Sequence, residues 1–120
     1  MSPLEQLRRI AEVEYGAIVI QADILGPKLR LLLTDTSYVD VWVSRKLGGR
    51  FGFHWERRHL DGRIYRYDNF PDTNWSVLPT FPHHFHDGSQ DAVVAAPFAF
   101  SLEQGFREFM AFVRQSLNVK

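Results

Sequence analysis

The sequence predicts an α+β fold, in which an antiparallel meander sheet of five to six strands packs against an N-terminal and a C-terminal helix. Two observations carry this prediction. Apolar residues recur at helical spacing near the two ends of the chain, whereas the middle consists of short segments that alternate apolar and polar residues. The turns between those segments are short, so consecutive strands are expected to pair as antiparallel neighbours. A chain of 120 residues fits one domain, residues 1–120.

The N-terminal helix is predicted from its start signal and its apolar stripe. Ser2 suits the N-cap position, Pro3 suits the first helical position, and Glu5 completes a capping box. Apolar residues then recur at helical spacing along one face: Leu4, Leu7, Ile10 and Ala11. Gly16 marks the end of this helix.

Five alternating segments and a brief sixth one are the predicted strands. They cover residues 17–25, 28–34, 38–44, 51–56, 63–68 and 91–95. The alternation in the first segment places four apolar side chains on its inward face: Ile18, Ile20, Ala22 and Ile24. Turn signals separate the segments at Gly26-Pro27, Gly48-Gly49 and Asp61-Gly62.

The C-terminal helix is predicted to begin at a second capping box, formed by Ser101 and Gln104. Its apolar face is broad, which is typical of a helix that packs on a core. The residues of that face are Leu102, Phe106, Phe109, Met110, Val113 and Leu117.

Composition places the chain among ordinary globular proteins, because 45% of the residues are hydrophobic and 23% are charged. The longest apolar runs are far shorter than the roughly eighteen residues of a membrane span. A secretory signal is not apparent before the first helix, so we expect a cytoplasmic protein. The chain has no cysteine, which excludes disulfides and thiolate-bound metal ions.

The net charge is zero, but the charges are distributed unevenly. Residues 45–66 contain seven basic and two acidic residues, a local balance of +5, whereas residues 68–108 contain one arginine and six acids, a balance of −5. The basic segment has two interpretations: charged strand edges that discourage aggregation, or a patch that binds a few phosphates. We expect a partner protein with acidic groups to cover this segment.

The densest group of chemically active side chains lies between residues 67 and 88. Three of the five histidines, His83, His84 and His86, fall within four residues. On an extended backbone His84 and His86 point to the same side, within reach of a common ligand or proton. An imidazole pKa near 6.5 suits both general acid and general base roles, and cleavage of RNA through its 2′-OH needs both. The three histidines are therefore candidate catalytic residues.

Three residues that precede the histidines are candidates for supporting roles. Arg63 and Arg66 carry planar guanidinium groups that match phosphate oxygens, so they are candidate phosphate-binding residues. Asp68 follows them and is a fourth candidate catalytic residue, which could orient a histidine and fix its tautomer. It could equally cap the turn that follows its strand, because aspartate commonly accepts hydrogen bonds from nearby backbone N–H groups.

Two other interpretations of the histidines are open at this point. His84 and His86 could share a transition-metal ion, with Asp87, Asp68 or His54 as a third ligand. The remaining ligands have no recognisable spacing, so we predict that the protein needs no metal ion and no other cofactor. In the second interpretation, the histidines donate hydrogen bonds to loop carbonyls and hold the segment on the sheet.

Two motifs resemble the signature of the TumE family: Arg63-Ile64-Tyr65-Arg66-Tyr67-Asp68-Asn69 and, after a short spacer, Phe81-Pro82-His83-His84-Phe85-His86. The resemblance implies the toxin component of a toxin–antitoxin pair, which is neutralised by a cognate antitoxin protein. Many members of this family have a lysine between the second and third histidines, where this chain has Phe85. A phosphate contact from that position is therefore not expected.

These observations together predict a toxin that is a metal-independent ribonuclease, with RNA as its candidate substrate and the histidines as its acid and base. The alternative is a non-enzymatic binding protein that inhibits a cellular target through a His-rich loop. A homodimer is a further candidate assembly, and a membrane partner is not expected.

Overall fold

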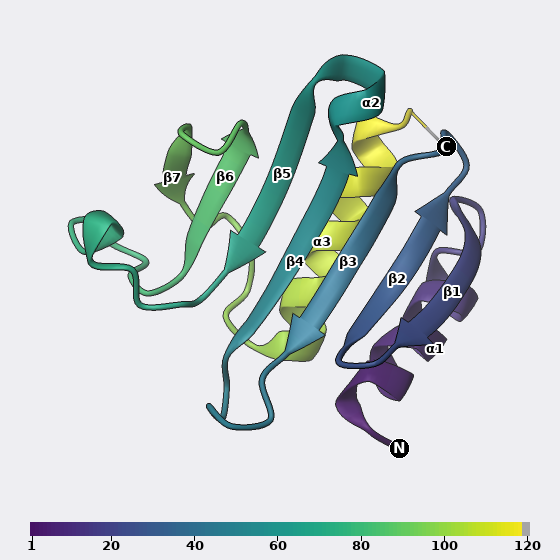
Figure 1. The fold of residues 1–120 in the computed structure, drawn as a ribbon, viewed down its shortest axis with the longest axis horizontal. Helices are drawn as coiled ribbons and strands as arrows, with labels where there is room; N and C mark the ends of the chain where they lie inside the picture. Colours follow the sequence, from purple (N-terminus) through teal and green to yellow (C-terminus); the bar gives the residue numbers. More distant parts are fainter. Residues whose placement is uncertain (119–120) are drawn as a thin grey trace.

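The computed structural model describes residues 1–118 and has the order helix, sheet, helix (Figure 1). The helices are α1 (Pro3–Glu14), α2 (Arg58–Asp61) and α3 (Leu102–Ser116), and a 3-10 turn spans Thr73–Trp75. The strands are β1 (Val19–Leu25), β2 (Lys28–Leu33), β3 (Tyr38–Val43), β4 (Phe51–Arg57), β5 (Arg63–Asp68), β6 (His84–Gly88) and β7 (Val93–Ala95). The last two residues of the predicted domain 1–120 lie outside the described residues.

The sheet is an antiparallel meander, as predicted, but it has seven strands in chain order rather than five to six. The additional strand is β6, in the segment that we expected to be a His-rich loop. Pro79 and Pro82 suggest an irregular backbone there, but both precede the strand, so neither removes a hydrogen bond from its ladder. From His84 onward the chain is a strand that pairs with β5 and with β7.

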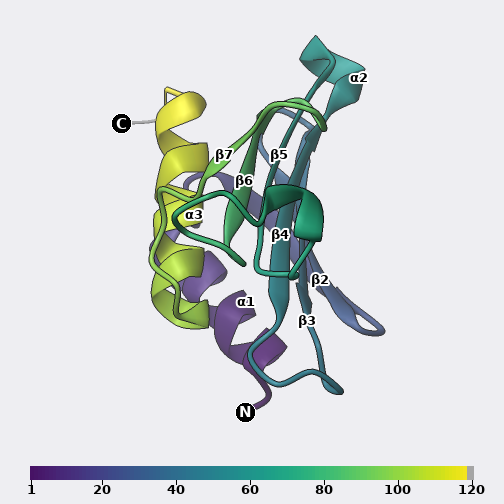
Figure 2. The ribbon, with the colours of Figure 1, turned by 90° about the vertical axis from the view of Figure 1, so that its left-hand side faces the viewer.

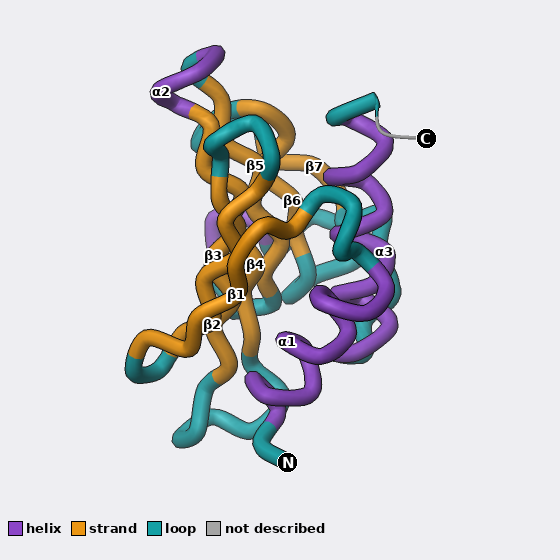
Figure 3. Tube along the Cα trace, turned by 90° about the vertical axis from the view of Figure 1, so that its right-hand side faces the viewer, coloured by secondary structure: helices purple, strands orange, loops and turns teal. Residues whose placement is uncertain are grey.

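Helices α1 and α3 lie side by side on one face of the sheet (Figures 2 and 3). The hydroxyl of Tyr15, at the end of α1, donates a hydrogen bond of 2.7 Å to the Arg107 carbonyl of α3 and joins the two helices. The core lies between the helices and the sheet, and its largest fully buried side chains include Phe53, Trp55, Tyr67, Phe106 and Phe109. None of the described helices has the length and the apolar composition needed to span a membrane.

The other sheet face is polar and has no long helix over it within residues 1–118 (Figure 2). Tyr67 and Phe85 of the paired strands β5 and β6 point into the core. Because side chains alternate along a strand, the even-numbered residues of these two strands point to the open face.

Three local predictions were wrong. A register shift between Val19 and Gln21 interrupts the alternation of β1, and Ile20 is 62% exposed instead of facing the core. The Ser101 side chain forms no cap hydrogen bond at the start of α3. The turn at Asp61-Gly62 is not a tight hairpin, because the one-turn helix α2 is inserted between β4 and β5.

Candidate active site

The register of β5 and β6 brings four predicted site residues together. Arg66 pairs with His86, and Asp68 pairs with His84. Residues that lie opposite each other in an antiparallel pair point to the same face, so all four side chains reach the open face of the sheet. The prediction that the His84 and His86 side chains point to the same side is confirmed. They do so because both lie on strand β6, not on a loop.

These four residues form the floor of a cleft with a volume of about 420 Å³, which we call the histidine cleft. The connection between β5 and β6 supplies one wall, with Phe70, Asp72 and Trp75, and Gln90 and Asp91 supply the other. The Trp75 ring lies 6.4 Å from the His84 ring and 6.4 Å from the His86 ring, measured between centroids. The Trp75 side chain therefore lies close to both imidazoles. Its sequence context alone did not distinguish this position from ordinary packing.

His84 has a hydrogen-bond acceptor at each ring nitrogen. Its Nδ1 lies 3.0 Å from the Pro82 carbonyl oxygen and its Nε2 lies 3.3 Å from Asp68 Oδ1. Neither partner can donate, so this environment favours a proton on each ring nitrogen, that is, the imidazolium form. Burial alone would lower the pKa of His84, but the Asp68 and Pro82 contacts raise it above its ordinary value.

His86 has the opposite environment, although it lies on the same face of the same strand. Its Nδ1 donates a hydrogen bond of 2.9 Å to the Gln90 carbonyl. Its Nε2 has no hydrogen-bond partner within residues 1–118, and no buried side-chain nitrogen of that part of the chain is unsatisfied, so Nε2 is open to the cleft. Burial lowers the pKa of His86 and the nearby charge of His84 lowers it further, which favours a neutral ring with a free lone pair.

Asp68 holds this arrangement in place. Its Oδ2 accepts a hydrogen bond of 2.8 Å from Arg66 Nε, and its Oδ1 accepts one of 3.0 Å from the Phe70 backbone N–H. Burial would raise the pKa of Asp68, but the hydrogen bonds from His84, Arg66 and Phe70 lower it to about 2. Asp68 therefore combines the two structural roles that the sequence left open. Its carboxylate caps the chain after β5, and the same negatively charged group orients His84.

The same cluster is the arrangement in which a metal ion could be held. One donor atom from each of Asp68, His84 and His86 lies within 4.8 Å of the others. Arg66 donates to the same carboxylate, however, and a permanent cation at that position repels a divalent ion. His84 Nε2 also faces Asp68 as a donor, and it would have to lose its proton to become a ligand. Both contacts weigh against the metal interpretation of this cluster.

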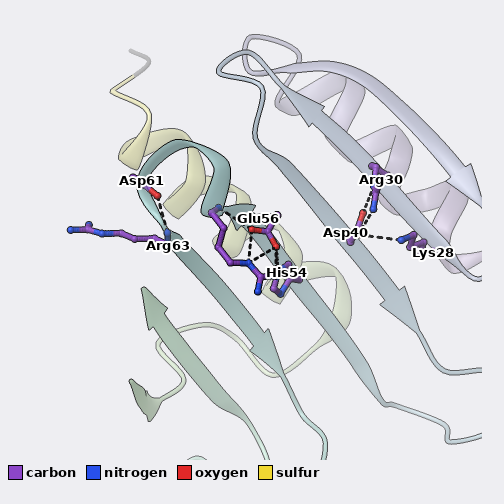
Figure 4. Close-up of polar contacts among 8 residues, drawn as sticks. Lys28, Arg30, Asp40, His54, Glu56, Asp61 and Arg63 are labelled. Atoms are coloured by element: carbon purple, nitrogen blue, oxygen red, sulfur yellow. Dashed lines mark hydrogen bonds and ion pairs between the residues drawn. The ribbon is translucent and has the colours of Figure 1, made fainter. Parts of the chain in front are cut away.

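Two of the predicted site residues lie outside the histidine cleft. His83 points to the helix side, where its Nδ1 lies 2.9 Å from the Tyr67 hydroxyl and its ring stacks on Phe100 at 4.0 Å. Arg63 lies at the opposite end of β5, and its side chain extends away from the sheet (Figure 4). Asp87, an alternative metal ligand, pairs with Tyr65 and so points away from the two cleft histidines.

The open face next to the cleft carries pairs of opposite charge (Figure 4). Asp40 binds Arg30 at 2.8 Å and Lys28 at 3.3 Å. Glu56 accepts hydrogen bonds from Arg58 and lies 3.2 Å from His54 Nε2. Most cations of this face are therefore already bound to carboxylates of the chain.

The fold and the cleft together define a small α+β protein with two unlike histidines on the open face of its sheet. A family model described as Toxin TumE matches residues 3–117. The chain therefore belongs to the TumE toxin family, and the resemblance of its two motifs is confirmed. No significant match was found among curated proteins or among solved structures. The family gives the biological class, a toxin.

Proposed function

We propose that this toxin is a cytoplasmic ribonuclease that cleaves RNA by attack of the 2′-OH on the adjacent phosphate, and that a cognate antitoxin neutralises it. The observation that carries the proposal is the contrast between two neighbouring imidazoles. His84 has an acceptor at each ring nitrogen, whereas His86 keeps one nitrogen free. Two titratable groups whose environments move their pKa values apart are the usual arrangement for an acid and a base.

The reaction assigns one proton to each histidine. His86 Nε2 removes the proton of the 2′-OH, and the 2′ oxygen forms a bond to phosphorus. The bond between phosphorus and the 5′ oxygen breaks, and the 5′ oxygen takes the Nε2 proton of His84. The products are a 2′,3′-cyclic phosphate and a 5′-OH, and the histidines have exchanged their protonation states.

The geometry at His84 is compatible with the acid role. Its Nε2 lies 3.3 Å from Asp68 Oδ1, which is long for a hydrogen bond between charged groups. The Nε2 proton can therefore be shared with an oxygen atom in the cleft. The two rings lie 5.2 Å apart between centroids, so both can reach one phosphate group.

Arg66 is the residue that we assign to the phosphate. Its Nε is bound to Asp68, which leaves the terminal N–H groups for a second anion. The guanidinium lies over Gly52, where a Cβ atom would come within 3.2 Å of its NH2 nitrogen. The absence of a side chain at Gly52 therefore gives Arg66 the room to lie across β4 beside the cleft.

One observation favours the alternative, a protein that inhibits its target by binding alone. The cleft is lined by the carboxylates of Asp68, Asp72 and Asp91 and by only one guanidinium, that of Arg66, among the described residues. That balance is less favourable for a polyanion than a basic groove would be.

Incubation of the purified toxin with RNA oligonucleotides, followed by analysis of the new ends, separates the two functions. The ribonuclease function predicts 2′,3′-cyclic phosphate and 5′-OH ends. Binding without cleavage predicts intact RNA together with growth arrest in cells.

A further inference from the structure

We infer that a second hollow, at the turn between β3 and β4, binds an acidic segment of the antitoxin that carries an apolar anchor. This inference rests on the proposed pairing with an antitoxin, but it concerns a different part of the surface from the catalytic histidines. The hollow has a volume of about 490 Å³, and we call it the hairpin hollow. Five of its lining residues are apolar: Pro27, Trp42, Val43, Leu47 and Phe70.

The apolar lining is already organised for binding. The Trp42 and Phe70 rings stack on each other with centroids 4.7 Å apart, and together they form a rigid wall. Leu47 is 56% exposed at the tip of the turn between β3 and β4. An apolar side chain inserted between this wall and Leu47 would lose its contact with water, which is the usual way in which an interface anchor contributes affinity.

The charge of the hollow identifies the kind of partner. Of the cations in the basic segment 45–66, Arg57, Arg58 and Arg66 are bound to carboxylates of the chain. Arg45 and Lys46 line the hollow and have no hydrogen-bond or ion-pair partner within residues 1–118. Both cations that line the hollow are therefore available to a partner.

The neighbouring surface extends the same chemistry. Another hollow, distinct from the hairpin hollow and the histidine cleft, has a volume of about 430 Å³ and lies on the other side of the turn. Its lining residues include Arg50, Phe100 and Leu102. Among residues 1–118, the Arg50 side chain donates a hydrogen bond only to the Asn69 carbonyl, so none of their carboxylates neutralises its charge. No acidic side chain of the described chain lines either of these two hollows. The surface around the turn between β3 and β4 is therefore formed by basic and apolar side chains.

A protein segment fits this surface better than RNA does. The Trp42 and Phe70 rings stack on each other, so one face of each ring is covered by the other ring. This leaves less aromatic area on which a base could stack. The apolar lining would instead face the polar phosphates and sugars of a strand. A segment that alternates Asp or Glu with Leu, Ile or an aromatic residue satisfies both the cations and the apolar wall.

The position of the hollow suggests how such a segment would neutralise the toxin. Phe70 lines both the hairpin hollow and the histidine cleft. Trp42 also lies on the open face, in register with Gly52 and Asp68 across β4 and β5. A segment bound in the hollow would therefore lie at the edge of the cleft and would obstruct the approach of a long substrate.

The test measures the affinity of the purified cognate antitoxin for full-length toxin and three variants. Arg45→Glu and Leu47→Ser alter the hollow. Arg63→Glu is the matched control, because Arg63 is an exposed cation of the same basic segment at the opposite end of the sheet. All three residues are exposed, so circular dichroism should report the same fold for each variant.

We expect Arg45→Glu and Leu47→Ser each to weaken binding by about tenfold or more, and Arg63→Glu to leave it within about twofold. RNA cleavage by the free Arg45→Glu toxin should be unchanged. Equal effects of the three variants, no effect of the first two, or no binding by the unaltered toxin would overturn the inference. An Arg45→Glu toxin that loses RNA binding but keeps antitoxin binding would assign the hollow to RNA. Failure of RNA cleavage in all samples would instead count against the proposed ribonuclease function.

Discussion

The histidine cleft and the hairpin hollow share Phe70 and lie on the same face of the sheet, yet they are built differently. In the cleft, hydrogen bonds from Arg66 and His84 fix the Asp68 carboxylate, and the strand register fixes the spacing of the groups. In the hollow, the aromatic wall is rigid but the cations have no fixed partner. A network of paired charges is suited to holding protons in defined places, whereas unpaired charges around an apolar wall are suited to binding a partner.

The largest effect is expected in the cleft. Replacement of His84 or His86 with alanine should slow RNA cleavage by roughly 10²–10⁴-fold, because in the proposed reaction each histidine supplies one proton transfer. The two losses should not multiply in the double variant, since residues that act as a unit give non-additive effects. Single-turnover cleavage rates of the purified variants measure this, and antitoxin affinity should stay unchanged.

His83→Ala is the control for that experiment, because His83 is adjacent in sequence but packs on Phe100 on the other side of the sheet. We expect a melting temperature lowered by several degrees and a cleavage rate that falls only with the folded fraction. A His83→Ala variant that is stable but does not cleave RNA would contradict the assignment of His83 to the core and not to the histidine cleft.

The next largest effect concerns the pH dependence. In the proposed reaction, cleavage requires neutral His86, whose pKa is lowered, and protonated His84, whose pKa is raised. The rate should therefore rise with pH through the His86 pKa, reach a maximum and fall as His84 loses its proton. Asp68→Asn removes the anion beside His84, so the falling limb should move to lower pH by roughly one to three units. If the falling limb of the Asp68→Asn profile stays at the same pH as in the unaltered toxin, Asp68 does not orient His84.

A smaller effect is expected at the phosphate contact. Arg66→Ala should weaken RNA binding and lower the slope of log affinity against log salt by about 1, because one phosphate contact is lost. Gly52→Ala should produce a milder version of the same defect by displacing the guanidinium. Filter binding over a salt series measures both, and an unchanged slope would show that Arg66 serves only to hold Asp68.

The smallest effect is expected from removal of metal ions. Because Arg66 occupies the carboxylate that a metal would need, we predict that treatment with a chelator leaves the rate and the melting temperature unchanged. Elemental analysis of the purified toxin provides the independent measurement. Stoichiometric zinc, together with loss of activity in the chelator, would return Asp68, His84 and His86 to the metal interpretation.

The sequence predicted the parts of this structure that follow from local patterns. Alternation and turn residues identified six of the seven strands, and the i and i+2 spacing placed His84 and His86 on one side. Strand β6 was missed because prolines precede it and its own residues are mostly polar, so that its identity depends on pairing with β5 and β7. The different environments of the two histidines could not be predicted, since they depend on the Pro82 and Gln90 carbonyls.

The same limit applies to the basic segment. Its balance of +5 was visible in the sequence, but the residues that remain available are decided by cross-strand and turn contacts. Arg57, for example, is bound to Asp35, which lies in the turn between β2 and β3, and to Asp61, four residues further along the chain. Only the folded structure shows that Arg57 is paired with carboxylates, whereas Arg45 has no such partner within residues 1–118.

The most direct test of the account is cleavage of one RNA oligonucleotide by the unaltered toxin and by His86→Ala, with thermal unfolding measured on the same samples. The account predicts 2′,3′-cyclic phosphate ends from the unaltered toxin and at least about 100-fold slower cleavage by a variant of the same stability. Equal rates for the two proteins, or intact RNA with a folded toxin that still arrests growth, would contradict the assignment of acid–base chemistry to the histidine cleft.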